Sequence, residues 1–532
     1  MSVSSFASAG RSGTPWWRRC AIPLVAGLIG LLSACAGGSG DSAQARSGQL
    51  TLAAPRDLFA GPDDPYFTHQ ALQVWEPLVT LDAELKPSPA LATTWKRSAD
   101  GRVWTFQLRG GVRFSDGSPL TAEAVVVNIE RFRRIAPKQS PFFSLDAGME
   151  SAYGRLKEVR ADGGAVVFEL ADPVADLPAR LANFFSMIQA PSAFDAAGRF
   201  AGKPVGTGPY MLVSSSKGQR VELIANPHYW GKRPALGKVV VRTIPDANAR
   251  VAALRAGEVD ALIDKGALLT GQVGAVAADR RFRVTRTPSV LTHYLTFNSS
   301  RGPFADPRLR EAVDLTIDRT MIAKRLLAGT ATPGASFLSP VFGDLADPNV
   351  RTPYDPERAR RLVSEVGRPS RPITILISSA EAGQFPYTDI AEVLRSALDQ
   401  AGLPARVSAV EATKTTMESG DYDIFLSAYS VPNGDADYLF RRFLRSDAEW
   451  NRQRGLGYDS EEFDRLIDRA AVSTDTTERR DLYRKVQRLL ATDRPMIPVA
   501  YQDNPVVASN ALTGLTQDAC YLVDLAKIAP AS

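Results

Sequence analysis

Alternating hydrophobic and polar residues predict a half-buried β-strand at residues 103–108, which read VWTFQL. Trp104, Phe106 and Leu108 lie on one side of this segment, with the period of two that a strand with one buried face requires. A Gly-Gly pair and an Asp-Gly step follow it and can form turns. We therefore expect Trp104 and Phe106 to lie in a hydrophobic core.

Capping residues mark where helices begin. Thr121 precedes an apolar pattern with helical spacing, and its hydroxyl can accept a hydrogen bond from a first-turn amide. Asp306 and Asp355 each precede a proline and then a helical pattern, which is typical of an N-cap followed by proline at the first helical position. Asp246 is a further N-cap candidate, and Gly257 is expected to end the helix that follows it.

Apolar runs alternate with helical patterns along the rest of the chain. We expect strands at EVDALI after Gly257, HYLTF near 293, ITILI at 373, DIFLSAY at 423 and IPVAY at 497, and helices at 386–400, 461–471 and 477–492. Strands that alternate with helices of about 10 to 15 residues are typical of an α/β protein. We expect its sheets to be mostly parallel.

The first 34 residues have the composition of a secretory signal. They contain three arginines and no acidic residue, and then an uninterrupted apolar stretch at 21–32. This stretch is too short to span a bilayer, which needs about 20 apolar residues. The sequence LLSAC ends at Cys35 and resembles the bacterial lipobox, in which the cysteine is lipidated and becomes the mature N-terminus. We therefore predict that Cys35 carries a lipid anchor.

Removal of the signal changes the charge and the cysteine count. Three of the positive charges in the formal +5 lie in the signal, so the mature chain carries +2, and its charge does not favour nucleic-acid binding. Cys20 is lost with the signal, which leaves Cys520 without a partner for a disulfide. A Gly/Ser-rich leash follows Cys35, and no later segment is apolar for 18 residues. The remainder is long enough for two or more domains.

Six segments, in this order, resemble the landmarks of family 5 extracytoplasmic solute-binding proteins, the peptide and nickel receptors of ABC importers. They read PALATTWKRSADGRVWTFQLRGGVRFSDGSPLTAEAV from 89, GTGPY from 206, NPHYW from 226, ALRAGEVDALI from 253, FNSSRGPFADPRLREAVDLTIDRTMI from 297 and YDPERARRLV from 354. The likeness extends over residues 50 to 525. It is specific because all six segments occur in the family's order and spacing.

The resemblance implies an α/β type II periplasmic-binding-protein fold, with two lobes joined by two crossover segments and an extra domain inserted in the first lobe. The crossovers are expected near 289–297 and 499–502. The implied division is a signal peptide at 1–34, a leash at 35–47, lobe I at 48–80, 205–290 and 500–525, the inserted domain at 81–204, and lobe II at 291–499.

The resemblance also implies a function. A lipid-anchored receptor on the outer side of the membrane captures a peptide-like or metal-chelate solute by closing its lobes, and delivers it to the permease and ATPase subunits of an ABC importer. We expect a monomer that binds no nucleic acid. Three alternatives stay open: a nickel or metallophore receptor, a chemosensory or chaperone-like receptor, and, with less support, a secreted hydrolase.

The motifs of catalytic and metal sites do not occur in the chain. His69, His228 and His293 are far apart in the sequence, and no HExxH, paired-cysteine or GxSxG motif accompanies them. GTGPY lacks the Lys-Ser/Thr pair of a phosphate-binding loop, so we expect a tight turn there. We therefore predict a binding protein without catalytic residues, a metal site or a cofactor. His69 could serve either the fold or the cleft, because the family uses its segment for binding.

Ordinary dipeptides are not favoured as the solute. In similar dipeptide receptors, an aspartate just before an Asn-Gly-Asp run binds the ammonium group of the peptide, and Pro432 stands at the matching position here. A charge-assisted hydrogen bond of this kind contributes about 1.5–3 kcal/mol. Asp435 or Asp437 could replace it if the loop turns differently.

A nickel chelate is not favoured either. In similar nickel receptors an arginine, two tryptophans and a histidine contact the chelate, and the matching positions here are Phe184, Phe142, Tyr429 and Asp447. Only Lys138 keeps a positive charge. These replacements favour a larger and less charged solute, such as a modified peptide or a metallophore.

Candidate ligand-binding residues come from three parts of the chain. They are Tyr66, Phe67 and Thr68 of lobe I, Lys138, Phe142 and Phe184 of the inserted domain, and Asn298, Tyr429, Asn433 and Asp435 of lobe II. Each aromatic residue could instead belong to a core. Tyr429 ends a predicted strand beside a Pro-Asn-Gly turn, where crevices form in α/β sheets, and this position favours a binding role.

Overall fold

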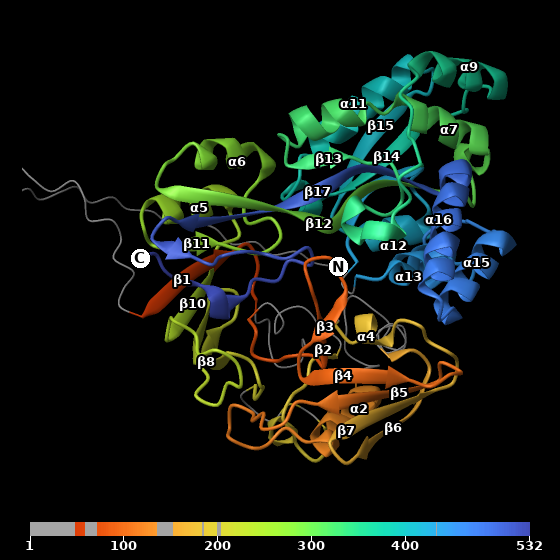
Figure 1. Cartoon of the computed structure of the whole chain (residues 1–532). Coiled ribbons are helices and arrows are strands. Elements are labelled where there is room, and N and C mark those ends of the chain that lie inside the picture. Colours follow the sequence, from red (N-terminus) through yellow and green to blue (C-terminus); the bar gives the residue numbers. More distant parts are fainter. Residues whose placement is uncertain are drawn as a thin grey trace, which may run out of the picture. The chain divides into compact units, whose positions relative to one another are not determined.

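The structure is a computed structural model that describes residues 48–58, 72–135, 153–182, 186–198, 200, 204–431 and 434–532. The predicted signal, Cys35 and the leash lie outside these residues. The described residues form one eleven-stranded sheet, a separate four-stranded sheet, two small strand pairs and the helices that cover them (Figure 1). The predicted α/β class is confirmed.

Helices begin where the capping residues predict. Thr121 and Asp246 accept hydrogen bonds from first-turn amides at 3.2 and 2.7 Å, and the Asp-Pro steps at 306 and 355 cap in the same way. Each such cap stabilises a helix by about 1 kcal/mol. The four helices are α2 (Ala122–Ile135), α5 (Ala247–Arg255), α7 (Pro307–Thr316) and α9 (Pro356–Val366). Gly257 follows the end of α5 with φ +70°, a conformation that suits glycine.

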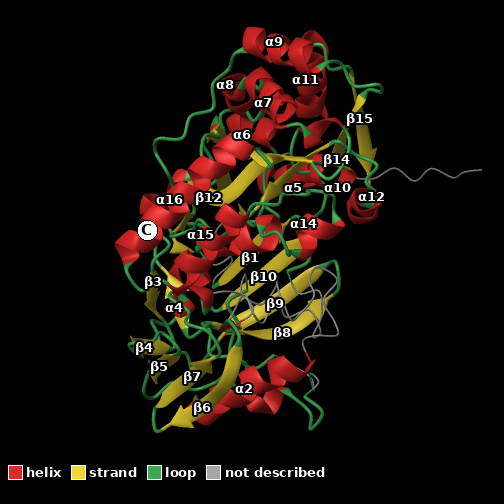
Figure 2. Ribbon diagram, turned by 90° about the vertical axis from the view of Figure 1, so that its right-hand side faces the viewer, coloured by secondary structure: helices red, strands yellow, loops and turns green. Residues whose placement is uncertain are grey.

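The large sheet has the strand order β15-β14-β16-β12-β17-β11-β1-β10-β9-β8, and β13 pairs with β17. Its strands, apart from β12 and β17, are β1 (Gln49–Ala54), β8 (Tyr210–Ser216), β9 (Arg220–Ala225), β10 (Lys238–Thr243), β11 (Ala261–Leu262), β13 (Ala331–Pro333), β14 (Ile373–Ser378), β15 (Ala405–Val410) and β16 (Ile424–Tyr429). Figure 2 shows β8, β9, β10 and β1 side by side.

The expectation of mostly parallel sheets is wrong. Parallel pairing is confined to β1 with β10 and β11, and to β14 with β15 and β16. The other ladders of the large sheet are antiparallel. A short turn such as the one between β8 and β9 reverses the chain and cannot form the crossover that a parallel pair needs.

Two long strands, β12 (Phe282–Phe297) and β17 (Met496–Ser509), pair in both halves of the large sheet. The first part of β12 pairs with the last part of β17, which also pairs with β11, whereas the last part of β12 lies between β16 and the start of β17. Their ladder shifts register between Pro288 and Thr292 and again between His293 and Tyr294. The hydrophobic pattern predicts only the last five residues of β12 and five residues near the start of β17. The first seven residues of β12 escape it because they are half-buried or exposed.

The four-stranded sheet is antiparallel, in the order β4-β5-β7-β6, and α2 packs against it (Figure 2). Its strands are β4 (Ala92–Arg97), β5 (Val103–Leu108), β6 (Leu156–Asp162) and β7 (Ala165–Leu170). Trp104 and Phe106 are buried, and the Phe106 ring lies edge-on to Phe168 with the ring centroids 5.4 Å apart. Their predicted place in a core is confirmed.

The predicted long helices of the C-terminal half are confirmed as α11 (Tyr387–Gln400), α15 (Glu461–Val472) and α16 (Thr476–Asp493). Short elements that the sequence pattern misses are α4 (Leu177–Arg180), α6 (Thr270–Ala277), α10 (Ser379–Ala382), α12 (Thr413–Ser419), α13 (Ala436–Leu439), η7 (Phe440–Leu444) and α14 (Glu449–Gln453). One hydrophobic core takes residues from 78 to 190 and another from 291 to 500. The residue bounds of the lobes and of the inserted domain stay a prediction.

The GTGPY segment bends at residues 207–209 and packs its backbone against the backbone of another segment. The expected tight turn stays a prediction. A Cβ atom at Gly206 or Gly208 would lie 2.1 or 1.9 Å from the carbonyl oxygen of Val74 or Gln73. Such distances are far below van der Waals contact, so only glycine fits at either position. The amide of Gly208 donates a hydrogen bond to Val74 O at 3.1 Å.

Glu76 lies next to the GTGPY segment and contacts Thr207 of that segment. One of its carboxyl oxygens accepts hydrogen bonds from the Thr207 hydroxyl (2.7 Å) and the Trp230 indole (2.8 Å). Burial raises the pKa of Glu76 from 4.5 to about 7, against the lowering effect of these two hydrogen bonds. The folded protein therefore holds this proton more tightly than the unfolded chain does.

We predict that Glu76→Gln changes how stability depends on pH. The contribution of Glu76 is complete below pH 4.5 and is lost as the pH rises through 7, because only the unfolded carboxyl ionises freely in that range. Glutamine keeps an acceptor oxygen and does not titrate. Urea unfolding at pH 4.5 and pH 8 should show the variant gaining on the order of 2 kcal/mol relative to wild type at the higher pH. An unchanged difference between the two proteins would contradict the assignment.

Candidate functional site

Charged side chains follow the carboxyl ends of strands in both halves of the large sheet. Asp264 and Lys265 come directly after β11, which is parallel to β1, and Glu381 in α10 follows β14, which is parallel to β16. β11 and β16 run in opposite directions, and the carboxyl ends of both point toward the middle of the β12–β17 pair, since Leu262 pairs with Val507 and Tyr429 with Thr292. The strand ends thus meet at an edge of the kind where ligands bind in α/β sheets. This edge is therefore the candidate site.

The charged groups of this edge differ in their partners. Arg56, just beyond β1, forms a bidentate ion pair with Asp264 at 2.7 and 3.0 Å. Glu381 accepts a hydrogen bond from the Ser427 hydroxyl of β16 at 2.8 Å. The Lys265 ammonium lies 5.7 Å from the centroid of the Phe385 ring. Residues from β11 and from the segment after α10 thus meet at this edge.

His293 of β12 lies beneath these groups and is completely buried. Its Nδ1 is 2.8 Å from the Tyr387 hydroxyl, and its Nε2 is 3.0 Å from Gln502 Oε1 of β17. A neutral ring with its proton on Nε2 satisfies both contacts, because Gln502 uses its amide nitrogen to donate to Thr330. Burial lowers the pKa of His293 to about 4, so the ring stays neutral near pH 7.

Tyr429 and Asn298 are candidate ligand residues whose side chains have protein neighbours. The Tyr429 ring packs 4.6 Å from Phe443 and 5.5 Å from Trp450, between centroids. Its hydroxyl is buried and has no hydrogen-bond partner of standard geometry among the described residues. Asn298 is buried and donates to the carbonyl oxygen of Tyr422 at 3.1 Å. Ligand contact by either residue stays a prediction.

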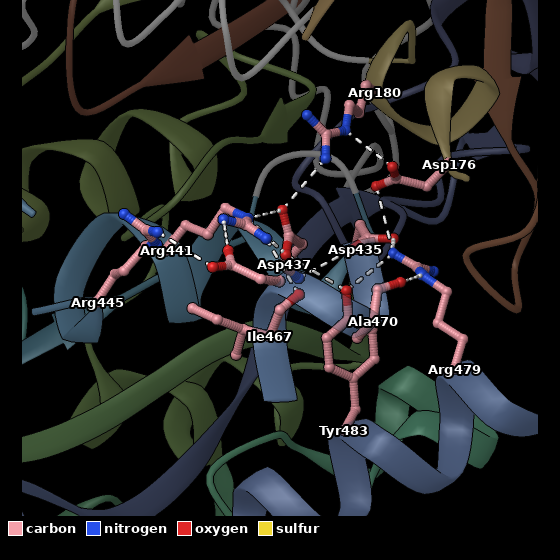
Figure 3. A network of polar contacts seen from close by, with 11 residues as sticks. Asp176, Arg180, Asp435, Asp437, Arg441, Arg445, Ile467, Ala470, Arg479 and Tyr483 are labelled. Carbon is pink, nitrogen blue, oxygen red and sulfur yellow. Dashed lines mark hydrogen bonds and ion pairs between the residues drawn. The ribbon is translucent and has the colours of Figure 1, made fainter. Parts of the chain in front are cut away.

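A network of four carboxylates and four guanidinium groups joins α4 to α13, η7, α15 and α16 (Figure 3). On the α4 side, Arg180 pairs with Asp176 at 2.9 Å and with Asp437 at 3.1 Å. Arg479 of α16 pairs with Asp435 at 2.6 Å and with Asp176 at 3.4 Å. The remaining members are Arg441, Arg445 and Asp468.

Burial and charge act against each other in this network. Burial favours the neutral form of Asp176, but Arg180 and Arg479 outweigh it and lower the pKa of Asp176 to about 2. For Asp435 the effect of burial exceeds the lowering effect of Arg479, and it raises the pKa of Asp435 to about 7. The negative charges of Asp176 and Asp437 add to the rise. Asp435 also accepts the amide of Asp437 at 2.7 Å. Its side chain thus has a structural role here, and ligand contact by Asp435 stays a prediction.

Most of the predicted ligand residues lie outside the described part of the chain. They are Tyr66, Phe67, Thr68, Lys138, Phe142, Phe184 and Asn433, together with the lipidation candidate Cys35 and with His69 and Pro432. The sequence reasoning missed Lys265 and Glu381. The available signal was their position, since each comes three residues after a strand.

Metal-ligand clusters and membrane-spanning helices would indicate other functions. No three His, Cys, Asp or Glu side chains among them gather as they would around a metal ion. In the same part of the chain, no helix has the length and apolar character needed to cross a bilayer. His228 takes part in a turn, in which its amide donates to Asn226 Oδ1 at 2.9 Å.

Comparison with known sequences identifies relatives of this chain. The profile of the family described as "Bacterial extracellular solute-binding proteins, family 5 Middle" matches residues 86–451. The chain is 30% identical over 437 residues to Di/tripeptide-binding protein 2 of Pseudomonas aeruginosa (strain UCBPP-PA14). That match covers 78% of this chain and 81% of the relative.

Solved structures share the fold. NikA from Brucella suis in complex with Fe(III)-EDTA matches with a TM-score of 0.79 at 24% identity, over 91% of this chain and 100% of NikA. DppA from Helicobacter pylori in complex with the peptide STSA matches with a TM-score of 0.75 at 25% identity, over 91% of this chain and 98% of DppA. The expected type II periplasmic-binding-protein fold is thereby confirmed.

We predict that Asp437→Asn strongly destabilises the protein. The substitution removes one of the two counter-charges of the buried Arg180 and of the half-buried Arg441, which leaves Arg180 only Asp176 and leaves the network with one positive charge in excess, at a cost of about 3 kcal/mol. Asp447→Asn is the matched control, because Asp447 pairs with Arg445 at the surface, where an ion pair contributes less than about 1 kcal/mol. Urea unfolding at pH 7 measures both. Equal losses in the two variants would show that the network adds nothing beyond surface pairing.

Proposed function

Because the chain belongs to the family 5 bacterial extracellular solute-binding proteins, we propose that it is the lipid-anchored solute receptor of an ABC importer. In this proposal the receptor closes its two lobes around a peptide-like solute and delivers it to the permease. Proteins of this family bind solutes rather than transform them. The observation that carries the proposal is the family match over most of the chain, together with the shared fold.

The geometry of the large sheet supports closure around a solute. β12 and β17 pair in both halves, and their ladder shifts register at Pro288–Thr292, so hydrogen bonding is interrupted where a hinge would bend. Charged side chains follow strand ends on either side of these two strands. A solute held there would contact both halves of the sheet. The proposed lobes keep the bounds expected from the sequence.

Solute binding can be measured directly. Protein purified from membranes, mixed with di- and tripeptides, glutathione or Ni(L-His)2, should melt at a higher temperature with at least one peptide. A solute at 100 times its Kd adds about 2.7 kcal/mol to the free energy of unfolding. Small-angle scattering of the same samples should show a smaller radius of gyration with the solute bound. A response to Ni(L-His)2 alone would support the nickel-receptor alternative, and no response to any solute would contradict the proposal.

We also propose that Cys35 anchors the receptor to the outer side of the membrane. Cys35→Ala should move the protein from the membrane fraction to the soluble fraction, because no lipid can then be attached at this position. Cys520→Ala is the control, since this thiol lies in the folded part and should not affect fractionation. Immunoblots of separated fractions measure both. Membrane retention of the Cys35 variant would contradict the anchor.

A further inference from the structure

Two separate hydrophobic cores meet at the ion-pair network of Figure 3. The first core lies in the four-stranded sheet and includes Leu177 and Leu181 at the two ends of α4. The second core is built on α13, η7, α15 and α16, and Leu85 is its only member among the described residues before 290. The amide of Ala175, just before α4, donates to the carbonyl oxygen of Ala471 in α15 at 3.1 Å. The described junction between the two cores is therefore largely polar.

The chain does not lead directly from the first core to the second. Between them it passes through β8, β9, β10, β11 and β12, and it reaches the second core at Val290, inside the first register shift of β12. A bend of the large sheet at this shift would move the two cores relative to each other. Contacts across the junction are therefore contacts that lobe closure would form and lobe opening would break.

Two ion pairs cross the junction. Arg180 contacts Asp437 at 3.1 Å, and Arg479 contacts Asp176 at 3.4 Å. The side chains of these four residues are at most 13% exposed, so water competes little for either pair. Arg479 also contacts Asp435 on its own side at 2.6 Å. Its guanidinium group thus offsets the repulsion between Asp176 and Asp435, two carboxyl groups that face each other from opposite sides.

Within the network, each side of the junction is electrically neutral on its own. On the α4 side, Arg180 and Asp176 pair with each other at 2.9 Å. On the other side, three carboxylates pair with three guanidinium groups at distances from 2.6 to 3.1 Å, and these residues are Asp435, Asp437, Asp468, Arg441, Arg445 and Arg479. Separation of the two sides would therefore leave no charge of the network without a counter-charge.

We propose that the two crossing pairs are a latch between the lobes. Arg180 and Asp437, and likewise Arg479 and Asp176, come into contact when the two cores approach and lose contact when the cores separate. Two neutral halves suit repeated opening, because neither half is left with an unpaired charge. The latch favours the closed arrangement before a solute arrives, so less of the solute's binding energy is needed for closure. This inference rests on the proposed receptor function and concerns its regulation.

The distance between the two sides of the junction measures the latch without any solute. Spin labels are attached to cysteines introduced at Lys96 of β4 and Arg465 of α15, in the full chain with its native cysteines replaced by alanine. Both positions are exposed, and neither side chain forms an ion pair among the described residues. We expect double electron–electron resonance of the solute-free protein to show one dominant short distance.

A double variant removes the latch. Asp176→Asn with Arg180→Met deletes both crossing pairs, whereas the other side of the junction keeps its own balance of charge. We expect the ratio of closed to open molecules to fall about 10- to 100-fold, so that a second, longer distance is seen. The matched control is Arg155→Met with Asp172→Asn, an exposed pair of the four-stranded domain at 3.0 Å that lies outside the network. It should leave the distances unchanged.

A milder variant keeps the test decisive if the double variant does not fold. Asp176→Asn alone keeps the pair of Arg180 with Asp437 and removes only the charge that Arg479 contacts across the junction. It should cause a smaller shift toward the longer distance.

The outcomes separate the latch from the receptor function. The latch is overturned if the unmodified network already gives mostly the longer distance, if the network variants keep the short distance, or if the control opens as far as the double variant. Binding of a solute with a decrease in radius of gyration would then leave the receptor function standing. A confirmed latch in a protein that binds no solute would contradict the receptor function alone.

Discussion

The pairing of β12 with β17 is the constraint on which the rest of the structure depends. These two strands hydrogen-bond to each other and carry the large sheet from β16 on one side to β11 on the other. Because both halves of the large sheet pair with the same two strands, the segments that follow the carboxyl ends of β11 and β14 come to one site. The register shifts in this pair interrupt its ladder between the two halves, and this is the place where the proposed closure would bend the sheet.

Two groups of buried or half-buried charged side chains lie around the β12–β17 pair. In the network of Asp176, Arg180 and Arg479, each buried charge has its counter-charge, and such a network holds α4 on the elements that it joins. Lys265 and Glu381 form no ion pair within 4.0 Å among the described residues, although the charge of each acts on the other. Burial of an uncompensated charge is unfavourable unless something supplies the missing partner.

Local signals in the sequence predict much of this fold and little of the site. Asp306 and Asp355 predict where their helices begin, because a capping residue acts within one helical turn. The burial of Trp104 is predicted by the alternation of apolar and polar residues in its own strand. The full length of β12 and the mixture of parallel and antiparallel pairs in the large sheet could not be predicted, because both depend on strands that are distant in sequence. Tyr429 was predicted from its place at a strand end, and ligand contact by it stays a prediction. Glu381 was missed, because only the folded sheet brings it to Ser427.

The most direct test of the account is a crystal structure of the receptor with its solute bound. The account predicts the solute at the carboxyl ends of β11 and β14, in contact with both halves of the large sheet, and a bend in β12 and β17 near the register shift when the free and bound structures are compared. A solute that touched only one half, or an unchanged arrangement of the two halves, would contradict it.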